Sequence, residues 1–344
     1  MTHSRTTTYQ PALAWFAALG AAWVFGVVTL GAFTTSIHAG MAFPDWPLSN
    51  GSINPEGWLT EVDKFAEHSH RLFGMVMGFL AITLAVWLQL REPRFWVRKL
   101  GWSALAIVII QGILGGKRVL LDSIDVPGFE MSLGQMLRIP HGILAQVYVC
   151  VLFAIAAGLS RRWIETPVAP ITPSASGARS PSGAPADIGC KIRLLGSIAT
   201  LLVIVQLIVA AVMRHNNAGL AIPSFPASST DGGILPVAWD FRIAIHFTHR
   251  VLAVVLTGVL GWLAVALWRS PAASRGFNFA AGLIVALVAG QITLGAITVL
   301  TFRNPYYTTA HVIGGAFILA TVFTVTWWAH RNVIERPATL PASA

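Results

Sequence analysis

The sequence predicts an all-α membrane protein with eight transmembrane helices, arranged as two pseudo-symmetric four-helix bundles. The 344 residues are 55% hydrophobic and only 11% charged, whereas a soluble domain has about 25% charged residues. The apolar residues gather into eight runs long enough to cross a bilayer, and the two halves of the chain repeat a set of motifs. The runs are 12–34, 66–90, 100–117, 140–160, 194–213, 244–267, 277–300 and 308–329.

The net charge of +9 could indicate a nucleic-acid partner, but its distribution indicates an orientation in the membrane. With the N-terminus inside, 14 of the 23 basic residues but only 4 of the 14 acidic residues fall in inner segments. This excess of Lys and Arg follows the positive-inside rule. We therefore expect contact with membrane lipid and no nucleic acid, with both termini in the cytoplasm. Residues 1–10 fit neither a signal peptide nor a transit sequence, which favours a bacterial cytoplasmic (inner) membrane.

Residues 166–189 separate four predicted spans from four others. This segment contains five prolines and many small residues, a composition that cannot form a core and is typical of a flexible linker. We predict an N-terminal bundle over residues 1–165, a cytoplasmic linker, and a C-terminal bundle over residues 190–344. The two cysteines, Cys150 and Cys190, have no metal-ligand or disulfide spacing and are predicted to be inert thiols.

The two predicted bundles repeat several motifs at nearly one offset. A loop segment and a His-Arg pair recur after 179 residues, which is difficult to explain by chance. The matching elements are 39–47 (AGMAFPDWP) with 218–226 (AGLAIPSFP), His70-Arg71 with His249-Arg250, Gln111 with Gln291, and His141 with His311. Because each half has an even number of spans, both copies have the same orientation. The sequence therefore predicts a parallel repeat about an axis along the membrane normal.

Four histidines lie in the first turns of the even-numbered spans, where an ionisable residue is costly and indicates a functional site. They are His70, His141, His249 and His311. All even spans start at the outer face, so we expect each bundle to hold two imidazoles at one depth, suited to be the axial ligands of a haem iron. Buried histidines that only form hydrogen bonds are an alternative, and a zinc or copper site would need more clustered ligands. The remaining histidines, including His68 and His215, are predicted not to be ligands.

One acidic residue distinguishes the first half from the second. Glu67 precedes His70 by three residues and shares its helix face, whereas the equivalent position in the second half is His246. A carboxylate beside a haem could move protons during a reaction, or it could pair with Arg71 or Lys64. This difference suggests that the first site carries out the chemistry and the second carries electrons.

Two arginines directly follow ligand candidates. Arg71 and Arg250 are turned about 100° from the preceding histidine on a helix, so they cannot point in the ligand's direction. They could form charge-assisted hydrogen bonds with the haem propionates. Alternatively, they could extend their guanidinium groups to the membrane surface.

These residues resemble the haem A synthase family of bacteria and mitochondria. The resemblance depends mainly on the Pro-Asp-Trp-Pro sequence of residues 44–47 together with the Glu-x-x-His-Arg sequence of residues 67–71. The Gln-Gly-Ile-Leu-Gly-Gly sequence of residues 111–116, His249-Arg250 and His311 add to it. The likeness covers nearly the whole chain apart from the tails and the linker.

The resemblance implies an enzyme that oxidises the C8 methyl group of haem O to the formyl group of haem A by successive hydroxylations. It implies that Glu67, His70 and His141 form the site where haem O reacts, and that His249 and His311 hold haem b. A haem O synthase would supply the substrate and a terminal oxidase would receive the product. A homo-oligomer is compatible with the sequence.

The sequence departs from some bacterial members, which have a cysteine pair in the first outer loop. Phe43 and Ser49 occupy that stretch here, so the cysteine-free form of the family is the relevant comparison. The alternative function is a dihaem b-type membrane cytochrome that only transfers electrons, although transfer across the bilayer would need ligand pairs at two depths. A haem-handling transporter is a third possibility, but its broken helices are not evident.

Overall fold

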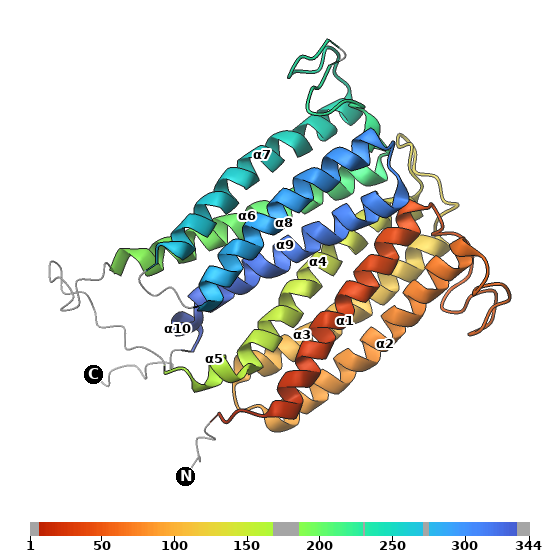
Figure 1. The fold of residues 1–344 in the computed structure, drawn as a ribbon. Coiled ribbons are helices and arrows are strands. Elements are labelled where there is room, and N and C mark those ends of the chain that lie inside the picture. Colours follow the sequence, from red (N-terminus) through yellow and green to blue (C-terminus); the bar gives the residue numbers. More distant parts are fainter. Residues whose placement is uncertain (1–6, 168–185, 230, 271–274, 336–344) are drawn as a thin grey trace.

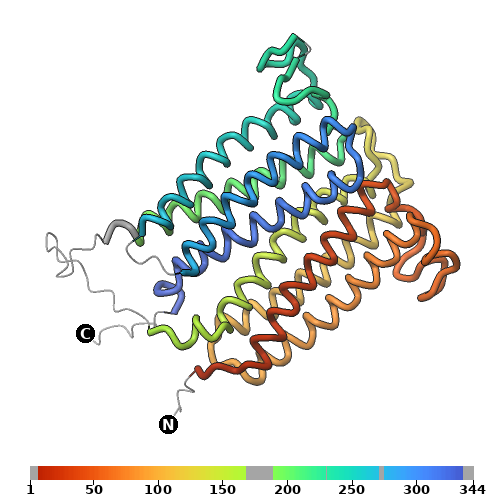
Figure 2. Tube along the Cα trace, viewed as in Figure 1, coloured from red at the N-terminus to blue at the C-terminus, as the bar shows by residue number. Residues whose placement is uncertain are grey.

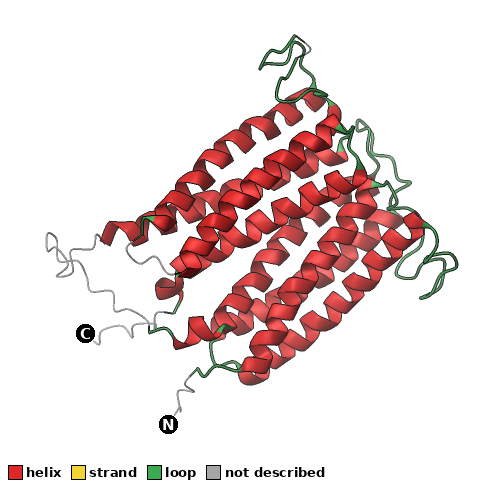
Figure 3. Cartoon of the chain, viewed as in Figure 1, coloured by secondary structure: helices red, strands yellow, loops and turns green. Residues whose placement is uncertain are grey.

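The computed structural model of the chain describes residues 7–167, 186–229, 231–270 and 275–335, which form helices and loops without a β-strand (Figure 3). Eight of these helices have the length and hydropathy to cross a membrane. They are α1 (Pro11–Ser36), α2 (Val62–Arg91), α3 (Phe95–Leu120), α4 (Leu133–Leu159), α6 (Ala186–His215), α7 (Phe241–Trp268), α8 (Arg275–Leu300) and α9 (Pro305–Ala329). Three short helices complete the described chain: α5 (Arg161–Glu165), η1 (Ala218–Leu220) and α10 (Arg331–Ile334).

Each predicted span corresponds to one long helix, which confirms the all-α membrane fold. Two helices begin well before their predicted spans: α6 begins at Ala186 rather than at 194, and α4 begins at Leu133 rather than at 140. Ser132 caps its N-terminus by accepting a hydrogen bond from the Gln135 N–H at 3.2 Å, and Pro140 lies inside the helix. The first seven residues of α4 include Gln135 and Arg138, so this segment is not apolar enough to be predicted as part of a membrane span. Most of the predicted linker lies outside the described residues, but its last four residues, 186–189, belong to α6.

The long helices pack in two groups, α1 to α4 and α6 to α9 without the short elements (Figures 1 and 2). In the first group, α1 packs against α2 and α4, and α3 also packs against α2 and α4, so that the four helices form a ring. In the second group, α6 and α8 both pack against α7 and α9, which gives a ring in the same order. Contacts of α9 with α1 and α4, and of α4 with α6, join the groups. The pseudo-symmetry of the two groups and the division into an N-terminal and a C-terminal domain stay predictions.

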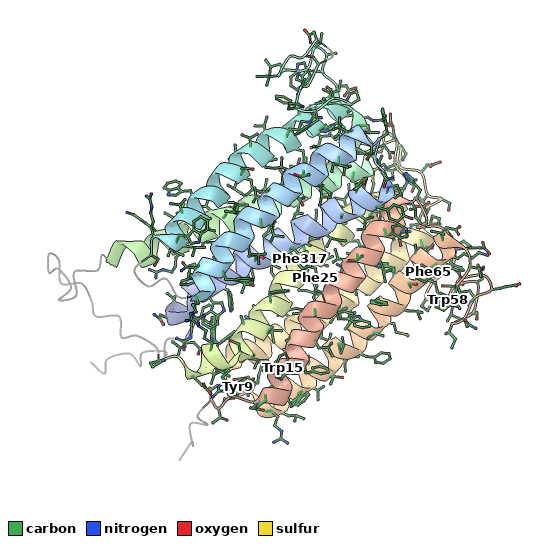
Figure 4. The ribbon with its side chains drawn as sticks, viewed as in Figure 1. Tyr9, Trp15, Phe25, Trp58, Phe65 and Phe317 are labelled. Atoms are coloured by element: carbon green, nitrogen blue, oxygen red, sulfur yellow. The ribbon has the colours of Figure 1, made fainter. Side chains whose placement is uncertain are left out.

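The interface between the two groups is built around α4 and α9. In each of these helices 44% of the residues in the most apolar stretch are buried, compared with 11% in α8, so they lie at the centre of the eight helices. Phe25 of α1 stacks on Phe317 of α9 with 4.2 Å between ring centroids (Figure 4). Cys150 of α4 packs into the apolar core of the second group and is a free buried thiol, while Cys190 is free and exposed.

Aromatic side chains lie near both ends of the bundle. Trp58 stacks on Phe65 at one end, and Tyr9 and Trp15 lie at the other (Figure 4). Their positions match the aromatic belts that mark the two membrane interfaces. The connections 37–61 and 216–240 lie at the Trp58 end (Figure 1), which we call the loop end.

A buried ion-pair network joins the two groups at the opposite end. Arg94 donates to Glu92 at 2.8 Å and to Glu335 at 2.9 Å. Glu335 also accepts from the Trp163 indole N–H at 2.5 Å, and Arg331 donates to the Trp163 carbonyl at 2.7 Å. Burial alone would lower the pKa of Arg94, but hydrogen bonds and attraction from Glu92 and Glu335 raise it above the usual value. These residues tie the α2–α3 connection to the segment that follows α9.

Replacing Glu335 by Gln should lower the free energy of unfolding by about 1–3 kcal/mol, because the buried Arg94 loses one of its two carboxylates while hydrogen bonds are kept. The shift can be measured by thermal unfolding in detergent. Glu165→Gln is the matched control, since its pair with Arg161 is more than half exposed and should contribute less than about 1 kcal/mol. Equal effects of the two substitutions would contradict a special role for the buried network.

Candidate functional site: two histidine pairs at the loop end

The structure brings the four predicted histidines together as two facing pairs. His70 of α2 faces His141 of α4 with ring centroids 6.4 Å apart, and His249 of α7 faces His311 of α9 at the same distance. The first three are each the ninth residue of their helix and His311 is the seventh. At 1.5 Å per residue they lie about 9–12 Å from the helix starts. Both pairs are therefore close to the loop end, but about one to two turns further into their helices than predicted, because these helices begin three to seven residues before the predicted spans.

The spacing within each pair suits a metal bound on both sides by imidazole. A bond between imidazole nitrogen and a transition metal is about 2 Å long, and the nitrogen lies about 1 Å from the ring centre. Two such ligands on opposite sides of one ion would place their ring centroids about 6 Å apart. The observed 6.4 Å in both pairs fits a bis-histidine haem iron, in which the flat macrocycle lies between the rings.

The first pair has the hydrogen bonds expected around metal ligands. The Nδ1 of His70 lies 3.1 Å from the Val27 carbonyl, so Nδ1 carries the proton and Nε2 is left as the acceptor that could bind iron. The Nδ1 of His141 is buried without a hydrogen-bond partner among the described residues, which is unusual for a buried polar atom. Gln111 donates to the His141 carbonyl at 3.0 Å and holds this part of α4, after Pro140, against α3.

The second pair is supported by two glutamines at repeat-related positions. Gln291, the equivalent of Gln111, donates to the His311 carbonyl at 2.9 Å, and the Nδ1 of His311 is likewise buried and unpartnered within the described chain. Gln206, at the position equivalent to Val27, donates to the His249 carbonyl at 2.9 Å and lies 3.0 Å from its Nδ1. Each histidine of this pair is thus held by a glutamine from a neighbouring helix, His249 by α6 and His311 by α8.

Glycines leave room for the rings. A Cβ added at Gly31 would come within 2.8 Å of the His70 ring, and one at Gly295 within 3.0 Å of the His311 ring, which is closer than side chains pack. Gly74 and Gly78 follow His70 by four and eight residues and lie on the same face of α2. A Cβ built at either glycine would have no other atom within 4 Å, so there is open space beside this face. A flat macrocycle could lie against this glycine-lined face.

Glu67 and Arg71 hold the first connection, 37–61, at the loop end of the first histidine pair. Glu67 is 4% exposed; one carboxylate oxygen accepts from the Phe43 N–H at 3.1 Å, and the other pairs with Arg71 at 2.6 Å. The guanidinium of Arg71 also donates to the carbonyls of Phe43, Asp45 and Leu48, at 3.0, 2.8 and 2.5 Å. Arg71 therefore neither extends freely to the surface nor keeps its terminal nitrogens for a propionate.

The second half repeats this arrangement with an imidazole in place of the carboxylate. Arg250 donates to the carbonyls of Ile222, Ser224 and Ala227, at 3.0, 2.6 and 3.0 Å. Each of these lies 179 residues after its counterpart in the first connection. His246 accepts from the Ile222 N–H at 3.2 Å and lies 3.4 Å from the Arg250 Nε. A neutral imidazole has one acceptor nitrogen, so it can satisfy only one of these two donors. In the first half, the two carboxylate oxygens of Glu67 satisfy both equivalent donors, the Phe43 N–H and the Arg71 guanidinium.

Asp45 fixes the shape of the first connection. Its carboxylate oxygens accept from the Asn50 and Gly51 N–H groups, both at 2.7 Å. Burial alone would raise the pKa of Asp45, but these backbone hydrogen bonds and the nearby Arg71 lower it below the usual value. His68 lies under the same connection, where its Nδ1 is 3.0 Å from the Ser49 hydroxyl, away from the His70–His141 pair as the sequence predicts.

Several charged residues near the first pair were not predicted as site residues. Arg118 of α3 is close enough to His70 and His141 to interact with them electrostatically, and Arg138 of α4 and His215 of α6 lie beside it. Arg214 of α6 donates to the Ala32 carbonyl of α1 at 2.8 Å, and it interacts electrostatically with His311 of the second pair. The signal available in the sequence was the cost of placing an arginine within a membrane span.

Comparison with known proteins gives the family. The family model described as cytochrome oxidase assembly protein matches residues 14–323. Among curated proteins, the chain is 27% identical to heme A synthase of Rhodospirillum centenum, over 99% of this chain and 92% of that protein. It is 26% identical to heme A synthase of Geobacillus kaustophilus, over 92% and 90%, and 25% identical to heme A synthase COX15 of Arabidopsis thaliana, over 92% and 73%. The chain belongs to the cytochrome oxidase assembly protein family that this model describes.

Proposed function

We propose that this protein is a haem A synthase, a membrane oxidoreductase that converts the C8 methyl group of haem O to the formyl group of haem A. The observation that carries the proposal is the pair of facing histidines in each half, spaced at 6.4 Å for a bis-histidine haem iron. The family match over residues 14–323 and the names of the relatives support the same activity. These matches do not support the alternative, a dihaem electron carrier, and the experiment below distinguishes the two.

The two sites differ in their proposed roles. His70 and His141 would hold the iron of the substrate haem O, and the mouth of this site carries Glu67. His249 and His311 would hold haem b, which supplies one-electron redox chemistry when bound. Because Glu67 holds Arg71 and the Phe43 N–H, it keeps the first connection in place over the substrate. A carboxylate at this point could also accept a proton as the methyl group is oxidised.

The proposed location is the bacterial cytoplasmic membrane, with both termini in the cytoplasm and the loop end outside. The eight apolar helices and the excess of basic residues in the inner segments support this orientation. Both histidine pairs would then lie near the outer surface, which does not suit electron transfer across the whole bilayer. A haem O synthase is the expected source of substrate, and the family description supports delivery of the product to a terminal oxidase.

The decisive experiment is co-expression with a haem O synthase in a host that lacks haem A. Chromatography of the extracted haems should show haem A only when both proteins are present. A folded, haem-loaded protein that leaves haem O unchanged would refute the synthase and favour the dihaem cytochrome. His330→Ala is a suitable control, since His330 caps the short helix α10 at the opposite end and should leave the product unchanged.

A further inference from the structure

Two arginines from different parts of the chain lie beside the second histidine pair at the loop end. Arg214 is near the end of α6, and Arg303 lies in the turn between α8 and α9. They are close enough to repel each other, and Arg214 also interacts electrostatically with His311. We call Arg214 and Arg303 the second-site arginines. They concentrate positive charge beside the candidate haem b site.

Hydrogen bonds fix Arg214 between α1 and α9. Its guanidinium donates to the Ala32 carbonyl and the Ser36 hydroxyl of α1, at 2.8 and 2.9 Å. The same hydroxyl accepts from the Thr309 hydroxyl of α9 at 3.0 Å, and Thr309 precedes His311 by two residues. This chain of hydrogen bonds holds the guanidinium next to the part of α9 that carries His311.

Arg303 lies against the loop that covers α7. A Cβ built at Gly219 would be 3.7 Å from the Cδ and 3.8 Å from the Nε of Arg303. Gly219 belongs to the short helix η1, which packs against α7, the helix that carries His249. The second-site arginines are therefore held by elements that pack on both helices of the histidine pair, α7 and α9.

The first half places a guanidinium at the equivalent point by means of a different residue. Gly40 is the counterpart of Gly219 in the repeat, and its carbonyl accepts a hydrogen bond from Arg118. The counterpart of Arg118, 180 residues later, is Thr298, whose buried hydroxyl has no partner in the described part of the chain. Arg303 lies against the same loop glycine from another position in the sequence. A cation at this point in both halves indicates that each histidine pair requires positive charge beside it.

The second-site arginines keep donors and charge that the chain itself does not satisfy. The Nε of Arg214 is buried without a hydrogen-bond partner among the described residues, although buried donors are nearly always paired. Within the same residues, neither arginine forms an ion pair with a carboxylate. A buried charge without a partner is strongly destabilising, and the planar donors of a guanidinium match a carboxylate in geometry. These features indicate that a carboxylate binds here.

We propose that Arg214 and Arg303 bind the carboxylates of the porphyrin held between His249 and His311. This inference rests on the proposed function, because it takes a haem as the occupant of the second pair. A haem carries its two carboxylates on one edge of the macrocycle, so two neighbouring cations can bind both. Arg250 does not fill this role, because its terminal nitrogens hold three loop carbonyls.

The test compares two porphyrins that differ only in the charge of these carboxylates. Ferric protoporphyrin IX and its dimethyl ester are titrated into full-length protein, purified without haem in detergent, and binding is followed by the Soret absorbance. Every protein carries His141→Ala, which disables the first pair. With both second-site arginines present, the dicarboxylate should bind about 10–100-fold more tightly than the ester. Partition of the ester into detergent is the same for all proteins, so differences in this ratio between proteins report the site.

Arg214→Met and Arg303→Met should each lower the ratio at least several-fold, because they weaken binding of the dicarboxylate and leave binding of the ester unchanged. Loss of packing alone would weaken both porphyrins equally and leave the ratio unchanged. If thermal unfolding shows that a Met variant does not fold, the Lys variant at the same position decides. Lys keeps the charge but not the planar pair of donors, so it should give a smaller decrease in the ratio.

The matched control is Arg242→Met, which removes an arginine at the same end whose side chain is 48% exposed and pairs with Glu130; its ratio should equal that of the unchanged protein. An unchanged ratio in folded Arg214 and Arg303 variants would overturn the carboxylate site. If the wild type forms no haem A on co-expression while the ratio depends on both arginines, the synthase is refuted and the carboxylate site stands.

Discussion

Replacing His249 by Ala should abolish the absorption spectrum of haem b in the purified protein. The imidazole of His249 faces His311 at the ring distance that a shared iron requires, and no other nitrogen ligand among the described residues faces His311 in the same way. Without His249, only His311 of this pair would remain to hold the haem, so a bound haem b would lose one of its two attachments to the protein. We expect less than about a tenth of the haem b content of the wild type, a loss equivalent to at least 1.4 kcal/mol of binding free energy.

The control for this substitution is His70→Ala, the equivalent change in the first half. It should keep the haem b spectrum and lose haem A formation, because the two ligand pairs belong to different helices. Pyridine haemochrome spectra of the two variants, measured on equal amounts of folded protein, separate the sites. Full retention of haem b by His249→Ala would contradict the ligand assignment. If only His70→Ala loses haem b, the proposed roles of the two halves are reversed, and the His70–His141 pair holds haem b.

The helices and the histidine pairs could be predicted from sequence because both depend on local or repeated patterns. An apolar run of about 18 or more residues has little alternative to a membrane helix, and all eight predicted spans correspond to long helices. The depth of His141 was less well predicted because α4 continues through Pro140 to Leu133. A proline within a hydropathy pattern usually indicates a boundary, but here the helix continues on both sides of it.

The contacts of Arg71 and Arg250 could not be predicted, although the repeat that contains them was. Each guanidinium binds three carbonyls of a connection more than twenty residues away. Nothing in the local sequence distinguishes such a contact from a propionate ligand, since both use the same donors.

Replacing Glu67 by His should stop haem A formation while leaving the first connection folded. The second half provides the reason, since His246 occupies the equivalent position and still accepts the Ile222 N–H while Arg250 holds three loop carbonyls. An imidazole at position 67 could therefore replace the carboxylate as a partner of the Phe43 N–H. What the substitution removes is the negative charge beside the substrate. If that charge takes part in the reaction, haem A formation should fall by about 100-fold or more.

Two readouts separate chemistry from loop anchoring in this variant. Limited proteolysis of connection 37–61 reports whether the loop stays closed, and chromatography of extracted haems reports the product. His246→Glu is the matched control, because it introduces the first-half carboxylate beside the haem b site and should change neither readout. If the Glu67→His variant keeps the loop closed and makes normal amounts of haem A, the carboxylate takes no part in the reaction and Glu67 only anchors the loop. An open loop with no product would point to anchoring, because Arg71 would then have lost the ion pair that an imidazole with a single acceptor nitrogen cannot replace.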